Sequence, residues 1–284
     1  MIVRAEWPGY VVDVLVRLAL LGRPDPVAQL ARPGDLALEG GVARRRRRPH
    51  PGRGVLVLTG APVLPGEVLG PTVVADVSVA AVVFGAAFTV NVDGKPVEPG
   101  TTFTLPAGAT LSIGPAASGA RGYLCVAGGF DGPEVLGSRS GLEAIAAGAV
   151  LPCRASRCEP RGIGFAALPA AGPLRALPGP QADWFTDDTF FAAEYVVAPA
   201  SNRMGLRLTG PQLARRAGEL VSEAVAPGAV QVANDGLPIV LGVDGQTIGG
   251  HPKVAHVIRA DLDRLAQLRP GDRVRFARVT VEEA

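Results

Sequence analysis

The chain has 284 residues with 37 Gly and 26 Pro, only 19% of its residues are charged, and 48% are hydrophobic. So many helix breakers exclude a coiled coil or a helical bundle, and the apolar content together with a net charge of +2 argues against a disordered chain. The near-neutral charge also gives no indication of nucleic acid or anionic lipid as a partner, which leaves a β-rich globular protein of one large or two small domains.

Residues 16–68 show no helical or strand period. They contain nine Arg, five of them consecutive at Arg44 to Arg48. A block of like charges repels itself and stays out of a core, so we expect a solvated loop there. A phosphate-binding patch is the alternative, but no aromatic residues are interleaved with the Arg run.

From about Leu69 onward, short apolar runs alternate with tight turns. AAFTVNVDGKPVEPG (86–100) predicts two strands around an Asp93-Gly94 hairpin turn, because Gly accepts a positive φ without steric cost. TTFTLPAGATLSIGP (101–115) predicts a second pair of strands around Pro106-Ala107-Gly108, and RGYLCVAGGF (121–130) predicts a buried strand.

Residues 156–180 are crowded with Pro, Gly and Ala and predict a linker between an N-terminal domain, 1–155, and a C-terminal domain, 181–284. In the second domain, GAVQVANDGLPIVLGVDG (228–245) predicts two strands around Asn234-Asp235-Gly236. ADLDRLAQL (260–268) predicts an amphipathic helix, and RPGDRVRFARVTV (269–281) predicts a turn and a terminal strand.

The three cysteines, Cys125, Cys153 and Cys158, form no C-x-x-C pair and predict buried free thiols in a reducing compartment. The apolar stretch from Val11 to Leu21 is too short for a bilayer span, and no signal peptide is evident. We therefore expect a soluble, cytoplasmic protein.

Polar side chains crowd residues 201–253 and interrupt the alternation that barrel strands require. Such interruptions favour a pocket for a polar ligand, in which Arg203 and Arg207 hold an anionic oxygen and Asn202 and Gln246 recognise an amide. The alternative is that the Asn and Asp residues only form turns and that the Gln residues face solvent.

Two other chemistries have less support. His251 and His256 are five residues apart and lack a third ligand nearby, so no metal site is expected. A triad drawn from Ser201, His251 and Asp244 lacks the G-x-S-x-G elbow that would expose the nucleophile.

Four strings together resemble one family. They are LPGPQADWF (177–185), SNRMGLRLTGP (201–211), SEAVAPGAVQVANDGLPIVLGVDGQTIGGHPKVA (222–255) and RGYLCVAGGFDGPEVLGSRS (121–140). They are similar to the biotin-dependent carboxyltransferase family, which includes allophanate hydrolase subunit 2, the sporulation regulator KipA and the C subunit of 5-oxoprolinase. The resemblance covers about residues 70–284.

The resemblance implies two cyclophilin-like β-barrel domains, with the N-terminal one incomplete. It implies the C subunit of an ATP-dependent 5-oxoprolinase that converts 5-oxoproline to glutamate with a KipI-like B subunit and a LamB/YcsF-like A subunit. One alternative is a biotin-dependent carboxyltransferase acting on urea or a similar amide. Another is a non-catalytic KipA-like regulator that binds a kinase inhibitor.

By the same resemblance, three residues are expected to be catalytic and six to bind substrate. The catalytic residues are Glu223, Asp244 and Lys253, with either carboxylate as base or orienter and Lys253 on anionic oxygen. The substrate-binding residues are Asn202, Arg203, Arg207, Gln231, Gln246 and Thr247.

The sequence departs from the family over residues 16–68, where the usual V-Q-D-L-G-R-x-G, G-G-A-x-D and N-x-L-V-G-N strings are missing. We expect this stretch to be read in a shifted frame, because GC-rich coding DNA gives Arg- and Pro-rich text out of frame. If so, the first barrel lacks strands, and we expect activity to be impaired. Translation of the same DNA in the other two frames tests this hypothesis.

Overall fold

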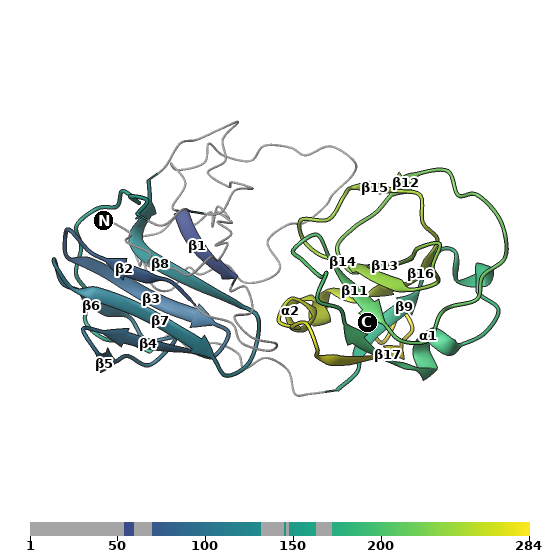
Figure 1. Ribbon diagram of the computed structural model, residues 1–284, viewed down its shortest axis with the longest axis horizontal. Helices are drawn as coiled ribbons and strands as arrows, with labels where there is room; N and C mark the ends of the chain where they lie inside the picture. Colours follow the sequence, from purple (N-terminus) through teal and green to yellow (C-terminus); the bar gives the residue numbers. More distant parts are fainter. Residues whose placement is uncertain (1–53, 60–69, 132–144, 146–147, 163–171) are drawn as a thin grey trace. The chain divides into compact units, whose positions relative to one another are not determined.

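The computed structural model describes residues 54–59, 70–131, 145, 148–162 and 172–284, and short strands dominate them (Figure 1). The prediction of a mainly β protein is confirmed. Contacts divide the described residues into two compact units, 54–162 and 172–284. No helix in these ranges is long and apolar enough to cross a membrane. The Arg44 to Arg48 run lies outside the described residues.

The first unit consists of two four-stranded sheets. One sheet has the order β1 (Gly54–Thr59), β8 (Arg121–Phe130), β3 (Val79–Gly85) and β6 (Phe103–Leu105). The other has the order β2 (Thr72–Val74), β7 (Thr110–Ala116), β4 (Phe88–Val92) and β5 (Lys95–Pro96).

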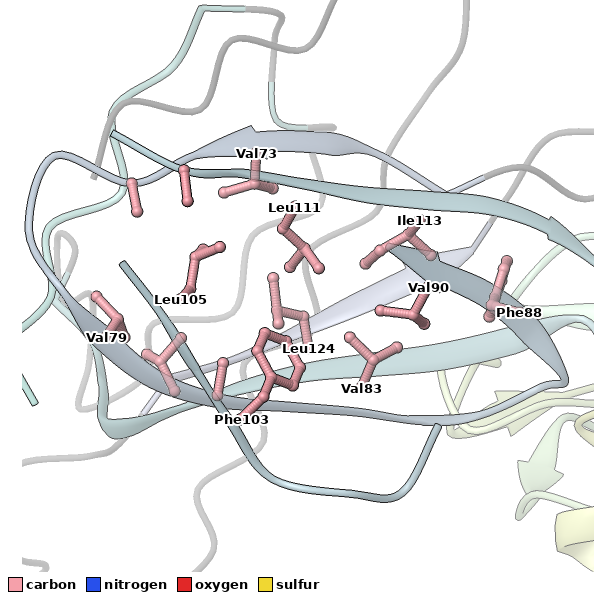
Figure 2. Packing of buried hydrophobic residues seen from close by; sticks show 14 of the residues in the cluster. Val73, Val79, Val83, Phe88, Val90, Phe103, Leu105, Leu111, Ile113 and Leu124 are labelled. Atoms are coloured by element: carbon pink, nitrogen blue, oxygen red, sulfur yellow. The ribbon is translucent and has the colours of Figure 1, made fainter. Parts of the chain in front are cut away.

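The inner faces of these sheets form an apolar core. Buried and less buried residues alternate along β7 and most of β8, since successive side chains of a strand point to opposite faces. Figure 2 shows the result, with Leu111 and Ile113 from one sheet packed against Leu124 and Val83 from the other. The described strands of this unit form two sheets, not one closed barrel.

The predicted turns have different outcomes. The Asp93-Gly94 hairpin is confirmed, with φ of 49° and 75° at the two residues, as a hairpin turn with two positive φ angles requires. Pro106-Ala107-Gly108 is a turn, but it does not join a pair of adjacent strands. β6 pairs with β3 and β7 pairs with β2 and β4, so this turn carries the chain from one sheet to the other.

The expectation that residues 16–68 contain no strand is wrong, because β1 lies at Gly54–Thr59. Its sequence GVLVLT pairs antiparallel with β8, with Val57 opposite Tyr123. The run is made largely of β-branched and aliphatic residues, which favour a strand. The Arg-rich text therefore ends before Gly54.

The second unit contains a closed barrel of seven strands and a separate two-stranded ribbon. The barrel order is β10 (Glu194–Val197), β11 (Gly205–Thr209), β14 (Pro238–Leu241), β13 (Ala229–Val232), β16 (Lys253–Val257), β9 (Leu174–Pro178) and β17 (Arg273–Arg278). The ribbon consists of β12 (Glu223–Ala224) and β15 (Ile248–Gly249). The short helices are η1 (Ala182–Trp184), α1 (Thr189–Ala192), η2 (Arg259–Asp261) and α2 (Leu262–Leu265).

The predicted linker, 156–180, is shorter than expected because both of its ends belong to the units. Towards the first unit, the Thr102 and Thr104 hydroxyls bond the backbone of Cys158, Glu159 and Arg161. Towards the second, β9 completes the barrel between β16 and β17. Pairing on both sides satisfies the backbone of β9 despite its Pro- and Ala-rich surroundings.

The predicted helix at 260–268 is realised as a chain of tight turns. Only Leu262–Leu265 is α-helical, and the 3-10 helix η2 precedes it. After it come two backbone hydrogen bonds between residues three apart, one of them from the Leu268 N–H to the Leu265 carbonyl. Leu265 is buried and packs in the barrel core, so the predicted apolar face is present on a shorter helix.

The three cysteines are free thiols, as expected, but each is half-buried rather than fully buried. Cys125 lies on β8, where burial raises the pKa of its thiol to about 12. At about pH 8 only on the order of one Cys125 in ten thousand is then a thiolate, the form that reacts with alkylating agents. We expect iodoacetamide to leave Cys125 unmodified in the folded chain and to modify it in denaturing guanidinium, as read by peptide mass spectrometry. Complete labelling of Cys125 in the folded chain would contradict its burial.

Candidate functional site

Five polar side chains meet where the β12–β15 ribbon lies over β13 and β16. The residues of this group, called the Lys253 cluster below, are Gln181, Glu223, Gln231, Gln246 and Lys253. Figure 1 shows β12 and β15 side by side at one end of the second unit. The cluster therefore combines barrel strands with a small ribbon outside the barrel.

Strand register accounts for this meeting. Gln231 pairs with Lys253 across β13 and β16, directly after a register shift at Val230. Such a bulge redirects the following side chain and is frequent beside functional sites. In the ribbon, Glu223 pairs with Gly249, so the ribbon brings its carboxylate to the same place.

The centre of the cluster is an ion pair. Lys253 Nζ lies 2.5 Å from Glu223 Oε1, and the Lys253 side chain is only 5% exposed, whereas that of Glu223 is 40% exposed. Hydrogen bonds from Lys253 and Gln181 lower the pKa of Glu223 below its ordinary value. A carboxylate of low pKa is a poor proton acceptor, so the geometry suits Glu223 as the residue that orients Lys253 rather than as the base.

A free hydrogen-bond donor lies beside this pair. Gln231 is 1% exposed, and its Oε1 accepts a hydrogen bond of 3.0 Å from Gln246 Nε2. Its own Nε2 has no partner among the described residues. A Cβ on Gly249 would come within 2.4 Å of that nitrogen, so the glycine is what lets the ribbon lie so close. A buried amide N–H without a partner is costly, so this nitrogen is a donor that calls for an acceptor.

Gln181 is the member of the cluster that sequence reasoning missed. Its Nε2 donates to Glu223 Oε1 at 2.8 Å, and its Oε1 accepts from the Lys253 backbone N–H at 3.1 Å. It lies just after β9 in the string LPGPQADWF, which carried part of the family resemblance. Its place in that string was the available signal.

Arg203 and Asp244 form a second pair, on two neighbouring turns. Arg203 Nε lies 3.6 Å from Asp244 Oδ2, and both side chains are largely buried. The turns are held together by the Gly242 N–H, which donates to the Met204 carbonyl at 2.9 Å. The Asp244 carboxylate therefore already lies beside the Arg203 guanidinium.

The other three predicted residues, Asn202, Arg207 and Thr247, are all exposed. Asn202 Oδ1 accepts from the Met204 N–H at 2.9 Å, which is the turn-forming alternative. Thr247 is exposed, and its carbonyl accepts from the Val225 N–H at 3.0 Å. Arg207 is exposed on β11, where its backbone bonds the Ser201 hydroxyl. The structure thus brings Glu223, Gln231, Gln246 and Lys253 together and places these three outside the cluster.

The sequence is similar to proteins of known type. The family model of the carboxyltransferase domain, subdomain A and B, matches residues 58–278. The C subunit of 5-oxoprolinase from Escherichia coli is 38% identical over 215 residues, covering 70% of this chain and 69% of that protein. The C subunit from Haemophilus influenzae is 37% identical over 216 residues, covering 71% and 70%. Urea amidolyase of Lachancea kluyveri is 28% identical over 267 residues, covering 79% of this chain but 14% of that protein.

Two solved structures of similar proteins superpose on this chain. A crystal structure of TTHA0988 superposes with a TM-score of 0.72 at 31% identity, covering 97% of this chain and 56% of that chain. Kluyveromyces lactis urea amidolyase superposes with a TM-score of 0.67 at 25% identity, covering 75% and 15%. The chain thus spans about half the length of TTHA0988 and a small part of urea amidolyase. Because the family match begins at residue 58, the last residues of the 16–68 range follow the family pattern, contrary to expectation.

Proposed function

The chain belongs to the carboxyltransferase domain family, subdomain A and B, and from this membership we propose that it is the C-type subunit of an ATP-dependent 5-oxoprolinase. One observation carries the proposal. Identity to the E. coli C subunit is 38% over 69% of that protein, against 28% to a urea amidolyase of which the chain covers 14%. The reaction is the opening of the 5-oxoproline lactam to glutamate.

The Lys253 cluster suits this chemistry. Opening a lactam requires that its carbonyl oxygen be stabilised as negative charge develops on it. In the proposed site, Gln231 Nε2 donates to the lactam carbonyl, and the Lys253 ammonium lies close by for the developing charge. Glu223, 2.5 Å from Lys253 Nζ, directs that ammonium.

ATP and the other subunits enter as parts of the same proposal. The donor set of the cluster does not fit a triphosphate, because the Glu223 carboxylate already neutralises Lys253. We therefore assign ATP to the partners, a KipI-like B subunit and a LamB/YcsF-like A subunit.

Carboxyl transfer is the second candidate, favoured by the urea amidolyase matches. The Gln231 N–H fits the carbonyl of urea, or of the ureido ring of biotin, as well as it fits that of a lactam. Biotin would carry the carboxyl group in that case. The cluster alone therefore does not separate the two substrates.

The test is reconstitution with a KipI-like B subunit and a LamB/YcsF-like A subunit. We expect ATP hydrolysis that requires both 5-oxoproline and this chain and that releases glutamate. Urea carboxylation with a biotin carboxylase partner, without 5-oxoproline turnover, would transfer the assignment to the second candidate. A tight complex with the KipI-like protein but no turnover would instead favour the KipA-like regulator and overturn the enzyme assignment.

A further inference from the structure

Gln181 connects three parts of the second unit that are distant in sequence. It follows β9, and its side chain contacts both β16 at Lys253 and β12 at Glu223. It is only 8% exposed. The chain around it is tightly fitted, since a Cβ on Gly179 would come within 2.2 Å of the Lys253 carbonyl oxygen. A buried polar side chain in so close a fit has few alternative orientations.

Each polar atom of the Gln181 amide has a defined role. Oε1 accepts from the Lys253 backbone N–H at 3.1 Å, and the Gln181 backbone N–H donates to the Lys253 carbonyl at 3.3 Å. These bonds fix the residue to β16. Nε2 then donates to Glu223 Oε1 at 2.8 Å, and that same oxygen receives Lys253 Nζ at 2.5 Å.

The ribbon that carries Glu223 needs such an anchor. β12 and β15 have two residues each and pair with each other, outside the closed barrel. Two-stranded ribbons of this size are marginally stable alone. Between the ribbon and the barrel, Glu223 receives hydrogen bonds from two described side chains, those of Gln181 and Lys253.

We propose that Gln181 is a positioning residue, which holds the Glu223 carboxylate on the Lys253 ammonium and so sets the direction of that ammonium. Gln181 touches neither substrate nor reacting atoms in this assignment. It acts through Glu223. The catalytic part of the inference rests on the proposed function, whereas the link between Gln181 and Glu223 stands on geometry alone.

A direct test follows the ionisation of Glu223 in the full chain. Its carboxyl resonance can be assigned in ¹³C-Glu-labelled protein by its loss in Glu223→Gln, and Lys253 is the charged group that faces it. Gln181→Glu keeps the acceptor for the Lys253 N–H but replaces the donor to Glu223 with a second carboxylate. Gln181→Met removes both bonds at similar volume. We expect the pKa of Glu223 to rise in both variants, because a donor to the carboxylate is lost, and to rise more in Gln181→Glu because like charges repel.

Activity of the reconstituted complex is the second readout. Gln181→Met should lower kcat about tenfold to a hundredfold, the scale of a misdirected catalytic group, while KM changes little. The acid limb of the pH–rate profile should move to higher pH, as the pKa of Glu223 does. Gln212→Met, at an exposed glutamine of the same unit, is the matched control and should change neither readout.

The two readouts separate the two hypotheses. An unchanged Glu223 titration in a folded Gln181→Glu or Gln181→Met chain overturns the positioning role. A raised pKa of Glu223 supports that role even when the complex does not open 5-oxoproline, a result that would count only against the proposed function. Gln181→Glu remains informative if Gln181→Met does not fold, because it retains the bond to β16.

Discussion

Replacing Lys253 with Met is expected to lower 5-oxoproline-dependent turnover of the reconstituted complex by about a hundredfold to a thousandfold, the usual effect of removing one donor to a developing oxyanion. The ammonium is the charged donor at the centre of the cluster, and its side chain is 5% exposed. Burial makes the loss large, because an ion interacts more strongly with its surroundings where water is excluded.

The same change should leave the fold intact. Methionine retains most of the aliphatic length of lysine, and the Glu223 carboxylate left behind is 40% exposed, so water can solvate it. Circular dichroism and the thermal midpoint check this. A folded Lys253→Met chain with normal kcat/KM would remove Lys253 from the mechanism.

A surface ion pair on the same barrel provides the control. Arg273 Nη1 lies 2.5 Å from Glu194, a pair as short as Lys253–Glu223, but the Arg273 side chain is 76% exposed. Arg273→Met should therefore change turnover little and stability by less than about 1 kcal/mol. Equal losses in both variants would mean that a general charge effect, not the cluster, is responsible.

Local sequence patterns predicted strands better than they predicted strand partners. The run at β8 and the turn between β13 and β14 are as expected, because alternation and Asn-Asp-Gly chemistry act within a few residues. The turn at 106–108 was also predicted correctly. Its flanking strands do not pair with each other, because β6 belongs to one sheet and β7 to the other. β9 was hidden in a Pro- and Ala-rich stretch, because its strand character comes from partners at β16 and β17.

In the candidate site too, residues close in sequence were predicted, whereas a distant contributor was missed. The family resemblance, within a polar stretch of sequence, pointed to Glu223, Gln231, Gln246 and Lys253, which lie within 31 residues of sequence and meet through neighbouring strands. Gln181 is 42 residues from Glu223, and a single Gln after Pro-Gly-Pro forms no pattern. For Asn202, the structure shows that Oδ1 accepts from the Met204 N–H in its own turn, and substrate binding by this residue stays a prediction.

A second buried charge, outside the Lys253 cluster, should dominate the stability of the barrel. Asp261 is 1% exposed at its side chain and accepts three hydrogen bonds from Arg175, including 2.7 Å from Nη2 and 2.7 Å from the backbone N–H. Burial alone would raise the pKa of Asp261, but the bonds and charge of Arg175, with Arg264 at 3.6 Å, hold it below its ordinary value. The carboxylate thus ties η2 to β9, the strand that closes the barrel.

Arg175→Met is expected to destabilise the second unit by about 3 kcal/mol, since removing one partner leaves a buried charge uncompensated. The value lies at the low end of the usual range because the Arg175 side chain is 42% exposed and Arg264 remains. Urea unfolding followed by Trp184 fluorescence measures it. Arg275→Met, at an exposed partner of Glu194, is the control and should cost less than about 1 kcal/mol.

The pH dependence distinguishes a buried ion pair from lost packing. With a folded-state pKa below the unfolded value of about 3.9, Asp261 contributes its stability above that pH and loses it as pH falls through the folded value. In Arg175→Met, burial without the guanidinium raises the pKa of Asp261, so acid should favour the folded variant. The stability gap between the two proteins should therefore be widest near neutral pH and narrow on acidification towards about pH 4. A gap that is the same at both pH values would mean that Arg175 acts through the packing of its stem, because packing does not titrate.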